Sequence, residues 1–310
     1  MGTRSSGIIH RMHIIWSPGY EVEIGPHVFP TRKYRLVKER LVADGTIAED
    51  DIVSPEPASR EQLALVHTSE YLRKIAEDDL SPAERLQLEV PFSAALREAM
   101  ILCCGGTIEC GRRALEETVC VHLGGGFHHA FANHGEGFCL LNDVAVAART
   151  LLEEGVVEHV AIIDLDVHHG NGTAAIFADD PAVFTFSMHQ ENNYPAVKPS
   201  GDLDVGLRDG VPDDDYLAIL DRHLSRMFRD HAVDLVFYLA GADPYREDQL
   251  GGLGLTLDGL RRRDRLVLSA SRRHGVPAAV TLAGGYALDT DDTIDIHCNT
   301  VREALARGAT

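Results

Sequence analysis

Five short apolar runs, each of strand length, alternate with amphipathic stretches from about residue 94 of this chain onward. The runs are Val119–Leu123, Val160–Leu165, Val183–Met188, Leu235–Ala240 and Ala278–Leu282. The helical stretches are Asn142–Glu154, Asp215–Arg229, Leu257–His274 and Thr293–Ala306. This alternation predicts an α/β fold with three layers, in which a mostly parallel central sheet carries helices on both faces.

The first ninety residues show a less regular pattern. They contain one expected strand, His13–Trp16, and one expected helix, from about Lys33 to Val42. The 310 residues include no linker or internal repeat, and 45% of them are hydrophobic, which is enough for a sizeable core. We therefore expect one domain over residues 1–310, with a flexible leader at about residues 1–11.

Each of the five expected strands ends in glycines and reactive side chains. The segments are Gly124–His129, Asp164–Gly172, Ser187–His189, Gly241–Pro244 and Ala283–Tyr286. In open α/β sheets, functional sites form outside the carboxyl ends of the strands. Loops that only connect elements need no such side chains, so the pattern predicts a functional site along this edge of the sheet.

The segment after the second strand indicates a metal site. Residues two apart on an extended backbone point to the same side, so Asp164, Asp166 and His168 share a face. Asp166 and His168 can then reach one metal ion, and burying such charges is costly unless a cation compensates them. The alternative is a helix N-cap after a strand, with its charges solvated.

Charge and cysteine usage limit the classes of partner. The net charge of −19 repels phosphate backbones, so we expect no direct nucleic-acid partner, although cationic peptides or polyamines would be attracted. No apolar run approaches the ~20 residues that cross a bilayer, so no membrane partner is expected. The cysteines form no CxxC pair, which predicts reduced core thiols in a cytoplasmic protein.

Five segments together carry a family resemblance. They are Gly125–Ala130, Gly137–Asp143, Asp164–Gly170, Gly241–Asp243 and Gly284–Tyr286. In this order and spacing they resemble the zinc-dependent histone deacetylase family, whose fold is shared with arginase. The likeness runs from about His27 to the last expected helix. Phe29–Tyr34 and Pro91–Ser93 look more like the class IV and related bacterial branch, which suggests longer acyl chains as substrates.

The resemblance implies a metal bound by Asp166, His168 and Asp243. Two carboxylates and one imidazole leave open positions for water and substrate, as a catalytic site requires. Such ligands suit Zn²⁺, and Fe²⁺ or Co²⁺ is also compatible. The alternative for Asp243 is an aspartate that initiates a turn before Pro244.

The resemblance also assigns a histidine dyad. His129 takes a proton from water and later delivers it to the leaving amine, while His128 is an electrostatic and hydrogen-bonding partner. Asp164 is the expected acceptor for His128, and Asn171 for His129. Many relatives carry aspartate at the position of Asn171, and a neutral amide raises the basicity of His129 less. Alone, two adjacent histidines could equally lie at the surface.

Tyr286 is expected to stabilise the oxyanion, and Tyr194 with the segment Gly137-Phe138 to bind substrate. A tyrosine after two glycines can also be an ordinary packed aromatic, and Tyr194 a surface one. The charged loop 246–249 is expected to be solvated, and His122, His134 and His189 to be core or supporting residues.

The resemblance further implies bound K⁺. The inner site uses the side chains of Asp164 and Ser187 with the backbone carbonyls of Asp166, His168 and Met188. The outer site uses the carbonyls of Phe177, Asp180 and Val183.

The function implied is hydrolysis of the acyl amide on the ε-amine of acyl-lysine in proteins or peptides. A deacetylase of acetylpolyamines or other small amides would use the same residues, and a metal-binding scaffold without turnover is an alternative of another class. An arginase-type hydrolase is disfavoured because it needs further Asp and His ligands for a second metal. A homo-oligomer is compatible with the sequence.

Overall fold

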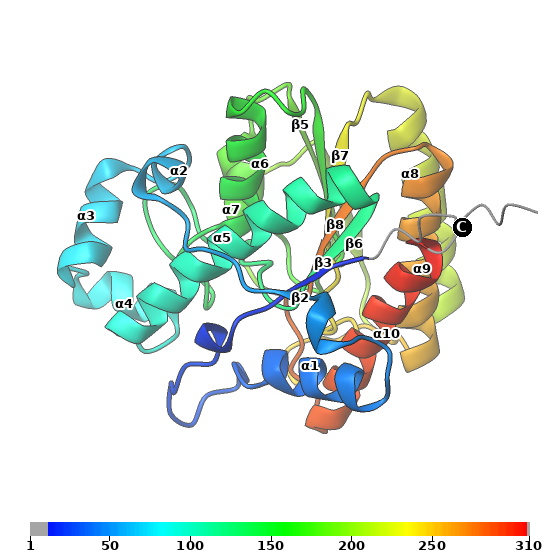
Figure 1. Ribbon diagram of the computed structural model, residues 1–310, viewed down its shortest axis with the longest axis horizontal. Coiled ribbons are helices and arrows are strands. Elements are labelled where there is room, and N and C mark those ends of the chain that lie inside the picture. The colour runs from blue at the N-terminus through cyan, green and yellow to red at the C-terminus, as the bar shows by residue number, and fades with distance from the viewer. Residues whose placement is uncertain (1–11, 309–310) are drawn as a thin grey trace, which may run out of the picture.

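A single sheet of eight strands forms the centre of the structure, a computed structural model that describes residues 12–308 (Figure 1). The strands are β1 (Ile14–Ile15), β2 (Ile52–Val53), β3 (Val119–His122), β4 (Val160–Asp164), β5 (Val183–Gln190), β6 (Leu203–Leu207), β7 (Leu235–Leu239) and β8 (Ala278–Thr281). Their spatial order is β2-β1-β3-β8-β7-β4-β5-β6, and every neighbouring pair is parallel.

Helices cover both faces of this sheet, so the predicted three-layer α/β architecture is confirmed. The helices are α1 (Lys33–Ala43), α2 (Arg60–Ala64), α3 (Ser69–Glu77), α4 (Pro82–Leu88), α5 (Ala94–Glu117), α6 (Asp143–Glu153), α7 (Asn171–Phe177), α8 (Asp213–Asp230), α9 (Leu257–Arg273) and α10 (Thr290–Gly308). In Figure 1, α5 and α6 lie on one side of the sheet and α8 and α9 on the other, with α10 packed on α9 and α1. The expected leader, residues 1–11, lies outside the described residues.

The central strands are apolar because both of their faces are covered. Every residue of β3, β4, β7 and β8 is buried, as is usual for strands of a parallel sheet beneath two helix layers. The adjacency of β8, β7, β4 and β5 also brings the carboxyl ends of the predicted strands side by side. The reactive segments that follow these strands therefore meet at one edge of the sheet.

Several features of the fold were not predicted from the sequence pattern. The edge strand β6 alternates half-buried and exposed residues and contains Asp204 and Gly206, so it lacks an apolar run. The 24-residue α5 has glycines in its middle, and a Cβ at Gly105 would lie only 1.8 Å from the carbonyl oxygen of Glu56. The short helices α2, α3 and α4 begin at capping side chains, Ser59, Thr68 and Ser81 respectively.

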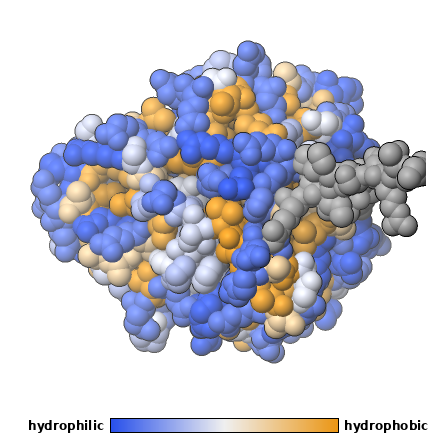
Figure 2. Space-filling model, in the orientation of Figure 1, coloured by the Kyte–Doolittle hydropathy of each residue, from blue (hydrophilic) through white to orange (hydrophobic). Residues whose placement is uncertain are grey.

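The visible surface in Figure 2 is largely hydrophilic, with hydrophobic side chains in separate patches. Within residues 12–308, no helix combines the length and the apolar character that a bilayer crossing requires.

His67 connects the N-terminal part of the chain, by hydrogen bonds, to the edge of the sheet where the reactive segments lie. Its Nδ1–H donates to the carbonyl oxygen of Phe131 at 3.1 Å, and its Nε2 accepts from the N–H of Asn142 at 3.1 Å. Asn142 in turn caps α6 by accepting from the N–H of Ala145 at 2.9 Å, and donates to the carbonyl oxygen of Ala130 at 3.1 Å. The contact in which Nε2 accepts requires a neutral ring, and burial lowers the pKa of His67 to about 4.

This contact makes stability depend on pH. The unfolded chain protonates His67 near its ordinary pKa of 6.5, whereas the folded chain does so only near 4. Between these values the unfolded state binds more protons, so the free energy of unfolding falls as the pH falls. Between pH 7 and pH 5, the free energy of unfolding of the wild type should fall by about 2 kcal/mol more than that of His67→Gln, as measured by denaturant unfolding. Equal losses in both proteins would contradict this role.

Candidate active site

Asp166, His168 and Asp243 meet at the carboxyl ends of β4 and β7, which are neighbours in the sheet. One ligand atom from each of the three lies within 4.8 Å of the others, and all three residues are buried. No other such group of His, Cys, Asp and Glu occurs within residues 12–308. The alternative of a solvated helix cap fails, because these charges are buried and the cap of α7 is Gly170, which has no side chain.

Backbone groups orient the two carboxylates. The N–H of Val167 donates to Asp243 Oδ1 at 2.9 Å, and the N–H of Gly284 donates to Asp166 Oδ2 at 2.8 Å. A Cβ at position 284 would lie 1.9 Å from Asp243 Oδ2, so only glycine fits beside this carboxylate. Asp243 Oδ2 itself has no hydrogen-bond partner and lies 3.5 Å from His168 Nδ1.

The residues fit a divalent metal ion. Burial and the neighbouring charge of Asp166 raise the pKa of Asp243. Despite its burial, the contacts of His168 with both carboxylates raise its pKa to about 10. The pair of carboxylates therefore favours a positive charge beside it, which a metal ion supplies when His168 is neutral. Two carboxylate oxygens and an imidazole nitrogen form a donor set that Zn²⁺, Fe²⁺ or Co²⁺ accepts. The unpartnered Asp243 Oδ2 supplies a free lone pair for such an ion.

His128 and His129 lie beside this group with their Nε2 atoms 3.1 Å apart. Asp143 positions them, because its buried carboxylate accepts from the N–H of Phe127 at 2.7 Å. The Nδ1 of His128 lies 2.6 Å from Asp164 Oδ2, and the Nδ1 of His129 donates to Asn171 Oδ1 at 2.6 Å. The structure thus pairs each histidine with the acceptor that the sequence predicts.

The surroundings push the two histidine pKa values apart. Burial lowers the pKa of His128, but the charges of Asp164 and Asp166 outweigh it and raise the value to about 9. Burial, followed by the charges of His128 and His168, holds the pKa of His129 well below its ordinary value. A protonated His128 therefore lies beside a neutral His129, which is the form that a general base needs.

Tyr286 is buried at the same site and is held by the loop that follows Asp243. Its N–H donates to Asp248 Oδ2 at 2.7 Å, and its carbonyl oxygen accepts from Gln249 Nε2 at 2.8 Å. The expectation that loop 246–249 is solvated is therefore wrong for Asp248, which is half-buried by these contacts. Burial and the charges of Asp166 and Asp243 raise the pKa of Tyr286, so its hydroxyl remains a donor.

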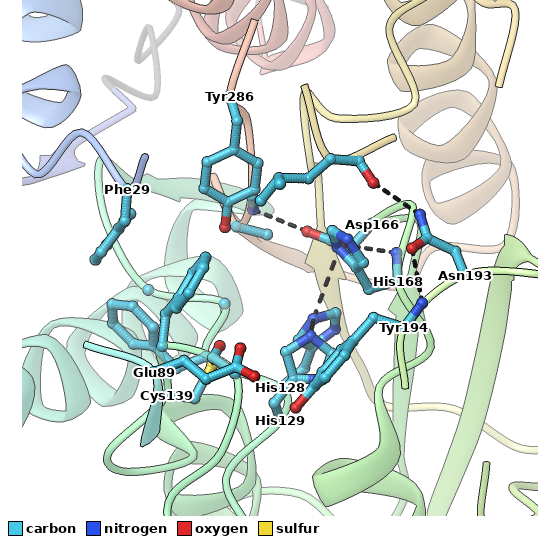
Figure 3. A pocket seen from close by; sticks show the side chains of 18 of the residues that line it. Phe29, Glu89, His128, His129, Cys139, Asp166, His168, Asn193, Tyr194 and Tyr286 are labelled. Carbon is cyan, nitrogen blue, oxygen red and sulfur yellow. Dashed lines mark hydrogen bonds and ion pairs between the residues drawn. The ribbon is translucent and has the colours of Figure 1, made fainter. Parts of the chain in front are cut away.

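A cavity of about 180 Å³ leads to these side chains. Its walls are largely aromatic: in Figure 3, Phe29, Tyr194 and Tyr286 surround a space whose floor is formed by His128, His129, Asp166 and His168. The Phe29 and Phe138 rings stack at 6.2 Å between centroids.

A strained turn places Phe138 in this wall. Gly137 and Phe138 have φ values of 53° and 69°, and a non-glycine residue in this region costs about 1–3 kcal/mol. The N–H of Phe138 donates to the carbonyl oxygen of Leu88 at 2.9 Å, which helps to hold the turn. A Cβ at Gly137 would lie 2.7 Å from His129 Cδ2, so glycine lets the turn approach the dyad.

Tyr194 lies at the pocket and not at a remote surface. Its ring centroid is 4.9 Å from that of His129, and its hydroxyl donates to Glu136 Oε1 at 3.0 Å. A direct role of Tyr194, Phe138 and Gly137 in substrate binding remains a prediction.

Sequence reasoning missed two charged residues at the site. Lys33 is fully buried, and its Nζ donates to the carbonyl oxygen of Ala283 at 2.6 Å. Burial lowers the pKa of Lys33 to about 8 despite the opposing charges of Asp243 and Asp166. In the sequence, Lys33 stands out only as the start of an expected helix and as part of the segment Phe29–Tyr34. Glu136 lies between Gly135 and Gly137 and gave no signal.

The residues of the expected K⁺ sites are neighbours in the structure. Asp164 and Ser187 pair directly in the register of β4 and β5, and Met188 follows Ser187. For the outer site, the N–H of Asp180 donates to the carbonyl oxygen of Phe177 at 3.0 Å, and that of Val183 to Asp180 at 3.2 Å. Binding of K⁺ at either place remains a prediction.

Comparison with known proteins identifies the family. A model of the histone deacetylase domain matches residues 27–301, so the chain belongs to the histone deacetylase family. It is 31% identical to histone deacetylase 2 of Arabidopsis thaliana, covering 90% of this chain and 75% of the relative. It is 29% identical to the acetoin utilization protein AcuC of Bacillus subtilis, covering 87% and 76%. The chain is accordingly a hydrolase that acts on amides.

Solved structures support the fold. A crystal structure of an HDAC homologue complexed with SAHA has a TM-score of 0.83 and 24% identity, covering 96% of this chain and 84% of that one. An HDAC homologue from Aquifex aeolicus gives a TM-score of 0.81 and 23% identity, covering 96% of this chain and 84% of that one.

A further sequence relative is an uncharacterised protein of Picosynechococcus. It is 42% identical to this chain, and the match covers 92% of this chain and 95% of the relative.

The site predicts a metal dependence that direct binding can test. Asp243→Asn should weaken binding of Zn²⁺ by at least about 100-fold, because a neutral amide replaces one of the two buried carboxylates. Metal analysis after equilibrium dialysis measures this, and Asp204→Asn, which removes a carboxylate bonded to His169, is the control. Unaltered affinity in Asp243→Asn would show that the metal binds elsewhere.

Proposed function

We propose that this chain removes the acyl group from the ε-amine of acyl-lysine in proteins or peptides by metal-dependent hydrolysis. The observation that carries the proposal is the convergence of a neutral, hydrogen-bonded His129, the hydroxyl-bearing Tyr286 and the Asp166–His168–Asp243 group at the end of one aromatic cavity.

Zn²⁺ is the metal in this proposal, with Fe²⁺ as the second choice, held by Asp166, His168 and Asp243. Such an ion supplies Lewis-acid polarisation of the amide carbonyl and makes water more acidic. The donor set and the unpartnered oxygen of Asp243 support this assignment.

The chain's own residues supply the proton transfers. The Nδ1–H of His129 is engaged by Asn171, so its Nε2 is the basic atom and takes a proton from the attacking water. The Tyr286 hydroxyl donates a hydrogen bond to the carbonyl oxygen as negative charge develops there. The proton on His129 then passes to the amine nitrogen as the C–N bond breaks, which leaves a carboxylate and the free amine. Asp164 raises the pKa of His128, which therefore stays protonated and stabilises the negative charge that develops on the carbonyl oxygen.

The cavity suits a thin, unbranched amine. Its aromatic walls offer apolar contact to the methylene chain of a lysine. Glu89 also lines the cavity and is exposed to solvent. A second candidate function is deacylation of acetylpolyamines, favoured by the same carboxylate and by the net charge of −19, because polyamines carry further positive charges. Amine release from each substrate class distinguishes the two.

We further propose that residues 1–310 form one catalytic domain, that K⁺ is bound near Asp164 and Ser187, and that the protein acts in the cytoplasm. The register of β4 and β5 supports the K⁺ site. Six cysteines that are buried as free thiols support a reducing compartment.

Substitution of the base and of the oxyanion donor tests the mechanism. His129→Ala should lower kcat for an acetyl-lysine peptide by about 10²–10⁴-fold, because no other side chain replaces the base. Tyr286→Phe should lower it by about 10²–10³-fold, because a hydrogen bond made in the transition state is lost. Tyr245→Phe is the matched control, since its hydroxyl donates to Asp292 outside the cavity.

Thermal unfolding and zinc content should be unchanged in both variants, so that a loss of kcat reports chemistry. Near-wild-type kcat in His129→Ala and in Tyr286→Phe would refute the proposed roles.

A further inference from the structure

A carboxylate lies one hydrogen bond behind the amide that supports His129. Asn171 accepts from His129 Nδ1–H through Oδ1 at 2.6 Å and donates through Nδ2 to Glu136 Oε1, also at 2.6 Å. The three side chains form a continuous line, and Asn171 is buried at the first position of α7. None of the steps described above uses Glu136.

The carboxylate decides which way the amide faces. A carboxylate only accepts hydrogen bonds, so Glu136 requires the NH₂ group of Asn171 on its side and leaves the amide oxygen for His129. The oxygen in turn requires a proton on His129 Nδ1 and leaves Nε2 unprotonated, 3.1 Å from His128 Nε2. Without Glu136, the amide could rotate, and its NH₂ group would then oppose the Nδ1–H.

Glu136 is itself held firmly. Its Oε2 accepts from Gln87 Nε2 at 2.8 Å and lies 3.4 Å from His134 Nε2, while Oε1 also accepts from the Tyr194 hydroxyl at 3.0 Å. Its backbone exchanges two hydrogen bonds with Cys139, at 3.0 and 2.9 Å. With only 14% of its side chain exposed, Glu136 keeps one orientation toward Asn171.

We propose that Glu136 is a positioning residue for the base: through Asn171 it fixes the tautomer and orientation of His129, and its negative charge polarises the intervening amide. This inference rests on the proposed role of His129. It also explains why an amide can stand next to the base, since the charge is supplied from one residue further away. The shared oxygen of Glu136 links Tyr194 in the cavity wall to the same line of contacts.

A purely structural role for Glu136 makes different predictions. If Glu136 only accepted the hydrogen bonds that hold Tyr194 and Gln87 in place, its loss would lower the unfolding temperature or raise KM, and kcat would be unchanged. A positioning role lowers kcat with KM within about twofold, because the orientation of the base matters in the transition state and not in substrate binding.

The test exchanges the carboxylate and the amide. Glu136→Ala should lower kcat about 10–100-fold, the usual range for a residue that orients a catalytic group, and Glu136→Gln about tenfold. The double variant Glu136→Gln/Asn171→Asp places the carboxylate directly against His129 Nδ1–H and the amide behind it. Its kcat should return to within about threefold of the wild type. Asn171→Asp alone should lower kcat, because two carboxylates then face each other.

Glu109→Gln is the matched control, because that carboxylate pairs with Arg113 on α5, away from the site. It should retain the wild-type kcat. Wild-type kcat in both Glu136 variants, or a loss in Glu136→Gln that the double variant does not recover, would overturn the inference.

A second readout does not depend on activity. In metal-free protein labelled with ¹⁵N-histidine, His129 should show a single tautomer protonated at Nδ1, identified by its absence in His129→Asn. Glu136→Ala should show a mixture of tautomers, whereas Glu109→Gln should not. An unchanged tautomer in Glu136→Ala would overturn the inference even if the wild type proved inactive. Inactivity of the metal-loaded wild type with the expected tautomer shift would refute the proposed function and leave the positioning role standing.

Discussion

The structure depends on the burial of two carboxylates, Asp166 and Asp243, at adjacent strand ends. Removing charged groups from water costs several kcal/mol for each ion, so the surrounding chain must compensate. Backbone N–H groups of Val167 and Gly284 donate to these carboxylates, and the ring of His168 lies between them. One oxygen still has no hydrogen-bond partner, which is the strongest structural reason to assign a cation there.

The same buried charge shifts the pKa values of the two neighbouring histidines. His128 gains a carboxylate partner in Asp164, whereas His129 gains only the amide of Asn171. Two chemically identical rings in contact therefore have pKa values shifted in opposite directions, and one holds a proton while the other can receive one. This division of roles arises from their neighbours and not from the adjacent positions of the two histidines in the sequence.

The sequence predicted the parts of the molecule that have a local signature. The central strands are apolar runs because both of their faces are covered. The extended spacing expected of Asp164, Asp166 and His168 is wrong beyond Asp164, because β4 ends there and the other two residues lie in the bend that follows it. Those side chains, the two histidines and Tyr286 all lie at one edge of the sheet as expected, although their roles in catalysis and metal binding are still predictions.

The parts that the sequence did not predict are created by contacts between distant segments. Lys33 is buried because it meets the carbonyl oxygen of Ala283, 250 residues away. Asp248 belongs to a charged loop that looks solvated, yet it holds the backbone of Tyr286. Glu136 gains its place from Asn171 and Tyr194, which no local pattern links to it. The strand β6 has one face in solvent and thus no apolar run.

Metal-dependent hydrolysis of an acyl-lysine amide can be measured as amine release from ε-N-acyl-lysine peptides, which carry acyl groups from acetyl to fatty acyl, and from acetylpolyamines. Each substrate is assayed before chelation, after it and after Zn²⁺ is restored. We predict turnover of peptides that chelation abolishes and zinc restores. Turnover of polyamines alone would identify small acylated amines as the substrates. Turnover that resists chelation, or no turnover of any substrate with metal bound, would refute metal-dependent deacylation by this site.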